Sequence, residues 1–119
     1  MNQDSVEIKN AKIISTMLGV EDHGIFSFWL ILNYGTFSGQ GFGGYCLDNY
    51  DKEKKIRVGT AFGCQVIMRI LKVVGVEKWE DLVNKYVRIK SNQSEILEIG
   101  NIIENKWLNL KNLAKEFGL

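Results

Sequence analysis

The chain has 119 residues, of which 45% are hydrophobic and 24% are charged, and its formal net charge is +1. This composition predicts one globular domain over residues 1–119 with a substantial buried core, and it excludes a disordered chain. The near-neutral charge gives no electrostatic basis for binding duplex DNA or an anionic membrane, so neither is an expected partner.

The same sequence indicates where the protein works. Its two cysteines, Cys46 and Cys64, are too few for a secreted disulfide framework, which favours a reducing compartment. The polar and charged segment Asn2–Asn10 does not have the pattern of a signal peptide. No apolar run approaches the roughly 20 residues that a membrane-spanning helix needs. We therefore expect a cytoplasmic protein.

The first third of the chain predicts two antiparallel strands joined by a turn at Leu18–Gly24. Val6–Met17 reads as a strand with a slip in phase near Asn10, which indicates a bulge. Ile25–Tyr34 has the clearest period-two pattern, and because both of its faces are largely apolar we expect a central strand covered on both sides. One face carries Phe26, Phe28, Leu30, Leu32 and Tyr34, and the other carries Ile25, Ser27, Trp29, Ile31 and Asn33.

The next segment, Gly35–Tyr45, holds five of the twelve glycines. After it, Gly43–Asp48 predicts a third strand, and the charged segment Asn49–Lys55 predicts a solvated connection. A glycine cluster implies backbone that turns sharply or approaches another group closely. The segment leads into a strand and not into a helix, so it does not match a dinucleotide-binding fingerprint. A bulged hairpin and one wall of a ligand site both remain open as explanations.

The second half predicts alternating strands and helices. Ile56–Val58 and the pair Tyr86–Ile89 and Ile96–Ile99 have strand patterns, and the pair forms a hairpin. Apolar spacings of three and four predict a helix over Thr60–Val74, capped by Thr60 or Gly59 and ended by Gly75. Shorter helices are expected at Glu77–Leu82 and Trp107–Phe117. The fold class is therefore α+β, an antiparallel sheet with helices packed on one face and a C-terminal helix.

Residues with catalytic or metal-binding chemistry are scarce. His23 follows Glu21 and Asp22, but one histidine and two distant cysteines do not make a zinc pattern, so no metal and no cofactor are expected. We interpret His23 and Asp22 as residues that stabilise a turn, and we expect no enzymatic activity. A nucleotide hydrolase that uses His23 with Asp22 stays open as an alternative.

The second glycine segment, Gly59–Gly63, opens a helix, where free N–H groups and the helix dipole favour an anion. With two arginines and the aromatic residues of the first glycine segment, it suits a small phosphorylated ring compound. We predict one ligand pocket formed by Gln40, Gly41, Phe42, Gly43, Gly44, Tyr45, Arg57, Thr60, Ala61, Phe62 and Arg88. Replacing Arg57 by alanine is expected to weaken binding and to leave the melting temperature nearly unchanged.

Five segments together resemble a family of small bacteriophage and prophage proteins, the first Thoeris anti-defence family. They are Glu21–Ile25 (EDHGI), Gly39–Asp48 (GQGFGGYCLD), Gly59–Gly63 (GTAFG), Val76–Leu82 (VEKWEDL) and the pair Val87 and Arg88. The resemblance implies a protein that binds and holds the cyclic ADP-ribose-type signal of bacterial TIR enzymes without degrading it. It also implies an α+β protomer, symmetric oligomers with pockets between protomers, and separate sites for cyclic oligonucleotides in some members.

The C-terminal residues independently predict a homo-oligomer, a dimer or larger. Trp107, Leu110, Leu113, Ala114 and Phe117 exceed what one helix needs to dock on a small sheet, with Leu108 and Leu119 adding apolar surface. Such an excess commonly marks an interface between copies.

A protein-binding inhibitor of a host defence nuclease, similar to an anti-CRISPR protein, is the rival function; it would present a broad patch without a nucleotide pocket.

Overall fold

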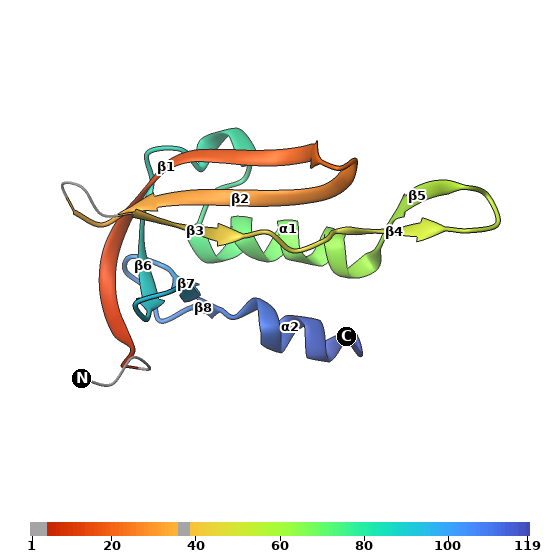
Figure 1. The fold of residues 1–119 in the computed structure, drawn as a ribbon. Helices are drawn as coiled ribbons and strands as arrows, with labels where there is room; N and C mark the ends of the chain where they lie inside the picture. The colour runs from red at the N-terminus through yellow and green to blue at the C-terminus, as the bar shows by residue number, and fades with distance from the viewer. Residues whose placement is uncertain (1–4, 36–38) are drawn as a thin grey trace.

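The computed structural model describes residues 5–35 and 39–119. Residues 36–38 of the glycine-rich segment therefore lie outside the described part. The strands form a six-stranded antiparallel sheet and a separate two-stranded hairpin, and two helices accompany them (Figure 1), so the expected α+β class is confirmed. The elements are β1 (Glu7–Asp22), β2 (Ile25–Asn33), β3 (Gly39–Gly43), β4 (Asp48–Asp51), β5 (Ile56–Gly59), α1 (Ala61–Val74), the 3-10 turn η1 (Trp79–Asp81), β6 (Tyr86–Ser91), β7 (Ile96–Gly100), β8 (Trp107–Leu108) and α2 (Leu110–Glu116).

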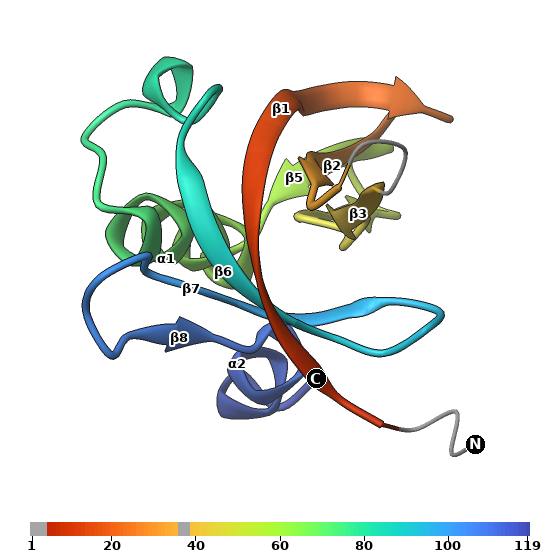
Figure 2. The same cartoon turned by 90° about the vertical axis from the view of Figure 1, so that its left-hand side faces the viewer.

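The long strand β1 organises the sheet because it pairs with two different neighbours. Residues Glu7–Lys12 pair with β6, and Lys12–Asp22 pair with β2, with a register shift between Ile13 and Ser15. The expected bulge is therefore present, but it lies between Ile13 and Ser15, a few residues beyond Asn10. Figure 2 shows the strong bend of β1 that results, as expected where a bulge increases local twist.

The predicted turn at Leu18–Gly24 is much shorter than expected. Strand β1 continues to Asp22, and only His23 and Gly24 form the turn, with φ angles of 53° and 75°. Left-handed φ values at both positions are those of a two-residue hairpin turn whose twist matches the strands. The alternating pattern weakens after Leu18 because these residues, Val20 among them, are exposed, so sequence periodicity could not show the continuation.

The core fills the concave side of the sheet, and both helices lie on that side. Strand β2 contributes Phe28, Leu30 and Leu32, which are fully buried, while α1 contributes Val66 and Ile70. Helix α1 begins after the N-cap Thr60 and ends at the left-handed Gly75, as the sequence predicted. The other face of β2 is covered only in part, contrary to expectation, since Trp29 and Ile31 are 39% and 37% exposed.

The C-terminal helix is shorter than predicted. Trp107 and Leu108 pair with β7 as strand β8, and Asn109 then caps α2 through its side chain. The argument for an interface on this helix is also wrong in part, because Leu108, Leu110 and Leu113 are at most 4% exposed. These residues complete the core, and of the apolar residues named for this interface Phe117 and Leu119 are the exposed ones.

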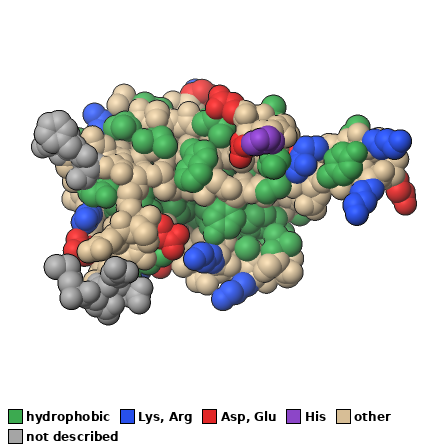
Figure 3. Space-filling model, in the orientation of Figure 1, with side chains coloured by type: hydrophobic (Ala, Val, Ile, Leu, Met, Phe, Trp, Pro, Cys, Tyr) green, Lys and Arg blue, Asp and Glu red, His purple; other side chains and the backbone are tan. Residues whose placement is uncertain are grey.

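The segment between β3 and α1 differs most from the prediction. In place of a strand over Gly43–Asp48 and a solvated connection, residues 44–47 are irregular and β4 pairs with β5. Figure 1 shows this hairpin as an arm that reaches beyond the sheet, and Figure 3 shows Lys and Arg side chains along it. Ile56–Val58 is a strand, as expected, but it lies in the arm.

The strand order is β3-β2-β1-β6-β7-β8. The chain forms a three-stranded meander, then a helix, then a hairpin that returns to β1. This is the connectivity of the five-stranded, partly open barrel called the OB fold. Curvature brings β3 near β7, but the two strands do not pair. The barrel is therefore left open between them.

Helix α1 approaches the sheet connection so closely that only glycine fits at Gly63. A Cβ atom there would lie 2.2 Å from the Leu47 carbonyl oxygen, which is backbone and cannot rotate away. We expect Gly63→Ala to lower the free energy of unfolding by about 3 kcal/mol. Urea denaturation measures this, with Gly59→Ala as the control because its Cβ would meet nothing within 4 Å. Equal stability of the two variants would contradict the packing described.

Candidate functional site

The glycines of β3 are explained by the aromatic side chains of β2. A Cβ at Gly41 would lie 2.8 Å from the Trp29 ring, and one at Gly44 would lie 2.6 Å from it. The Trp29 ring thus lies against the backbone of β3 and the residue that follows β3. A Cβ at Gly43 would lie 2.5 Å from the Phe28 backbone carbonyl oxygen and 2.9 Å from the Phe28 ring. Close approach of these side chains accounts for the three glycines, and Gly43 and Gly44 also have φ angles of 137° and 79°, which favour glycine.

A pocket of about 370 Å³ lies in the open side of the barrel. One wall belongs to β2, β3 and the residues after β3, and the facing wall consists of residues 94–97 and 109–111, from the β6–β7 turn, β7 and the start of α2. The volume is within the range of small-molecule sites, roughly 300–1,000 Å³. The first wall is formed by Trp29, Gln40, Gly41, Phe42, Gly43 and Tyr45.

The polar groups of this pocket include one buried acceptor without a donor. The side-chain oxygen Oε1 of Gln40 is buried and has no hydrogen-bond partner within residues 5–35 and 39–119. A buried amide oxygen without a partner costs about 1–3 kcal/mol. Lys111 and Glu95 form an ion pair at 3.8 Å on the facing wall, both with exposed side chains. The pocket wall therefore contains a residue with a buried, unpartnered acceptor, and the pocket rim carries charges.

Phe42 and Tyr45 have different roles in the wall. Phe42 is 3% exposed and packs edge-on against Phe28, so it belongs to the core. Tyr45 is half-buried, and its ring centroid lies 6.4 Å from that of Phe62. Among the predicted aromatic contacts in this wall, Tyr45 is thus the one with an accessible surface.

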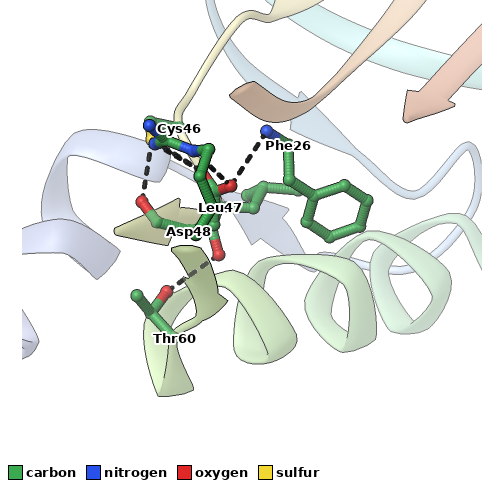
Figure 4. A network of polar contacts seen from close by, with 6 residues as sticks. Phe26, Cys46, Leu47, Asp48 and Thr60 are labelled. Carbon is green, nitrogen blue, oxygen red and sulfur yellow. Dashed lines mark hydrogen bonds and ion pairs between the residues drawn. The ribbon is translucent and has the colours of Figure 1, made fainter. Parts of the chain in front are cut away.

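Arg57 lies outside the pocket and has a structural partner. Its Nε and Nη2 atoms donate to the two carboxylate oxygens of Asp48 at 2.7 and 2.9 Å. Asp48 is 5% exposed and also accepts from the Phe26 backbone N–H at 3.2 Å and from the Cys46 thiol (Figure 4). The Arg57 hydrogen bonds, more than the opposing effect of burial, hold the pKa of Asp48 well below its usual range.

The N-terminus of α1 is capped by the side chain of Thr60. Thr60 Oγ1 accepts from the Gly63 N–H at 2.9 Å and donates to the Leu47 carbonyl oxygen at 3.0 Å. Phe62 is 6% exposed and packs against Tyr45 and Phe117. Thr60, Ala61 and Phe62 line a second, smaller pocket of about 200 Å³ that shares no lining residue with the first.

Arg88 lines neither of these two pockets. Its Nε and Nη2 donate to the carbonyl oxygens of Asn101 and Glu104 at 2.7 and 2.9 Å, and its guanidinium lies 4.7 Å from the centre of the Trp107 ring. The prediction that all eleven residues line one pocket is therefore wrong. Five of them, Gln40, Gly41, Phe42, Gly43 and Tyr45, share the pocket, and Gly44 lies beside it under Trp29.

His23 lies in the β1–β2 turn, where its Nδ1 contacts the Asp22 carboxylate. Its side chain is 89% exposed, and it lines neither of the two pockets described above. Within the described ranges, no three histidine, cysteine or acidic residues are grouped to hold a metal ion. This placement fits a residue that stabilises its own turn.

Sequence reasoning missed the facing wall and Trp29. Ser94, Glu95, Asn109 and Lys111 come from a hairpin turn and a helix start that have no ligand-binding motif of their own. Only the register of β2 against β3, with Trp29 opposite Gly43, could have indicated that the indole lies on glycine backbone.

Comparison of the chain with protein-family models, curated proteins and solved structures gives no match. Among the described residues, the helices are too short or too polar to cross a membrane. The site must therefore be interpreted from its own geometry.

Asp48 gives a pH-dependent prediction. Because its pKa is lowered in the folded state, its ion pair stabilises the protein above the unfolded-state pKa of about 3.9, and this stabilisation is lost as the pH falls through and below that value. At pH 7 we expect Asp48→Asn to lower the free energy of unfolding by about 1–3 kcal/mol, and the difference from the unmodified chain to shrink below pH 4.

Denaturant titrations at pH 7, 5 and 3 measure this effect. The matched control is Asp81→Asn, since Asp81 is exposed on η1 and should change stability by less than about 0.5 kcal/mol. A stability difference for Asp48→Asn that stays constant from pH 7 to 3 would show that the carboxylate charge does not matter. The sequence predicted that Arg57→Ala would leave the melting temperature nearly unchanged. Because Arg57 is the partner of the buried Asp48, we now expect this substitution to lower the melting temperature.

Proposed function

We propose that this chain binds a cyclic, adenine-containing nucleotide signal of the cyclic ADP-ribose type in the β3–β7 pocket and holds it without chemical conversion. The observation that carries the proposal is the buried Gln40 Oε1, which lacks a donor in the described part of the chain and lines a pocket of about 370 Å³. An acceptor in that position recognises a ligand with a hydrogen-bond donor, because the donor removes the cost of the unpaired oxygen.

The pocket walls complement such a nucleotide at three points. The exocyclic nitrogen of adenine supplies the donor for Gln40. Trp29 and Tyr45 present aromatic surface in the same wall, and a base stacked on an aromatic ring gains about 1–3 kcal/mol. Lys111 on the facing wall supplies a positive charge for the diphosphate, releasing Glu95 to solvent. These contacts suit a ligand with a planar base at one end and phosphate at the other.

Retention without conversion requires affinity and no catalytic group. Depleting a signal at submicromolar concentration needs a dissociation constant near 1 nM, about −12 kcal/mol. A pocket on the open side of one small barrel buries only part of a nucleotide, so we propose that a second copy of the chain closes it. Together with the resemblance to the Thoeris anti-defence family, this supports the proposal of a phage-encoded anti-defence factor that acts in the cytoplasm of the host bacterium.

Binding is tested by calorimetric titration of cyclic ADP-ribose isomers into the purified protein. We expect Gln40→Ala to weaken binding roughly tenfold, since a ligand donor that loses a neutral acceptor loses about 1–1.5 kcal/mol. Gln65→Ala is the matched control because Gln65 lies on α1 and outside this pocket. Both variants should keep the melting temperature within a few degrees of the unmodified chain.

Retention is tested by heating the complex to denature the protein and analysing the released nucleotide by chromatography. Intact ligand supports sequestration, whereas a hydrolysis product favours the enzyme alternative. Absence of any binding heat, for any isomer, would contradict the proposal and favour the protein-binding inhibitor. Equal affinity of the Gln40→Ala variant would place the ligand elsewhere on the chain.

A further inference from the structure

The convex face of the sheet, opposite the core, carries aromatic and basic side chains in neighbouring register positions. Lys12 on β1 lies opposite Tyr86 on β6, and the next row joins Asn10, Arg88, Gly100 and Trp107 across four strands. At the other end of the face, Trp29 lies opposite Met17 on β1 and Gly43 on β3. Register positions on this side of the sheet therefore run from β3 to β8, across the bend of β1.

Two aromatic side chains on this face have a ring surface available to a ligand. Trp29 is 39% exposed, and the Gly41 and Gly44 backbone supports its ring from below. Tyr86 is 56% exposed on β6. A flat ring fixed on backbone loses little freedom when a base stacks on it.

Basic side chains lie between and beside these rings. Lys12 Nζ lies 5.9 Å from the centre of the Tyr86 ring, while Arg88 and Lys90 lie 4.7 and 4.2 Å from the centre of the Trp107 ring. Neither Lys12 nor Arg88 forms an ion pair with a carboxylate in the part of the chain that the structure describes. Lys90 has Glu98 at 3.8 Å. Lys12 and Arg88 thus have no acidic partner among the described residues, and Arg88 keeps only its remaining N–H groups for a ligand because Nε and Nη2 donate to carbonyl oxygens.

We propose that this convex face binds single-stranded nucleic acid, with Trp29 and Tyr86 stacking on bases and Lys12, Arg88 and Lys90 contacting the phosphate backbone. Alternating stacking surfaces and cations are what recognition of an unpaired strand requires. The face is distinct from the pocket that the proposed function uses, although Trp29 borders both.

The charge and the size of the face favour a short single strand over a duplex. The net charge of +1 cannot supply the many phosphate contacts of a duplex-binding surface. The affinity gained from stacking depends less on salt than the affinity gained from phosphate contacts, and stacking needs unpaired, exposed bases. From Trp29 to Trp107 the path crosses four strand spacings and several residues, about 25–30 Å by strand geometry. That length accommodates a strand near the lower end of known site sizes, roughly four nucleotides or more.

Fluorescence anisotropy with fluorescein-labelled oligo(dT) and oligo(U) of twelve nucleotides tests the proposal and separates DNA from RNA. We expect binding at 50 mM salt with a slope of log K against log salt near −2, from about 0.7 per contacted phosphate and three cations. Tyr86→Ala should weaken binding about tenfold, and Lys12→Ala about three- to tenfold. A hairpin duplex of equal charge should bind more weakly than either single strand.

The matched controls are Tyr50→Ala and Lys52→Ala, because both residues are exposed on the β4–β5 arm and away from this face. The controls should bind like the unmodified chain. Three results would overturn the proposal: no binding of either oligonucleotide at 100 µM protein, equal affinity for the duplex or for heparin, or unchanged affinity in both Tyr86→Ala and Lys12→Ala. Gln40→Ala should leave oligonucleotide binding intact, so failure here and failure of the pocket proposal are distinguishable.

Discussion

The close contact between the Trp29 indole and the glycine backbone of β3 determines both surfaces to which we assign a role. On one side it fixes a ring on the convex face; on the other it places Trp29 in the wall of the β3–β7 pocket. Any side chain at Gly41 or Gly44 would have to displace the ring, because its Cβ would come within 3 Å. These two glycines therefore leave room for the aromatic side chain.

The second constraint is the buried carboxylate of Asp48. It connects β2, through the Phe26 N–H, to the arm, through Arg57, and its neighbour Leu47 accepts the two hydrogen bonds that fix the start of α1. Removing its charge would leave a buried acceptor with poorly matched donors. The arginine that seemed from the sequence to await a phosphate is thus the internal partner of an aspartate. The OB-type connectivity by itself assigns no function.

Local patterns predicted the elements that depend on local interactions. The apolar spacing of α1 with Thr60 and Gly75 at its ends, the period-two pattern of β2 and the β6–β7 hairpin all followed from neighbours within a few residues. Features that depend on distant partners did not follow: the pairing of β1 with both β2 and β6, and the exposure of Trp29. The site shows the same division, because its first wall lies in one segment while Lys111 comes from about seventy residues further along the chain.

The central claim is that a nucleotide binds between β3 and β7, and chemical-shift mapping on ¹⁵N-labelled protein tests it most directly. Titration with a cyclic ADP-ribose isomer should shift the Gln40 side-chain amide and the backbone amides of residues 40–45, 94–97 and 109–111, which line or border the pocket. The amides of residues 57–62, around Arg57 and the start of α1, should move little. Shifts confined to residues 57–62, or no shifts at saturating nucleotide, would contradict the account.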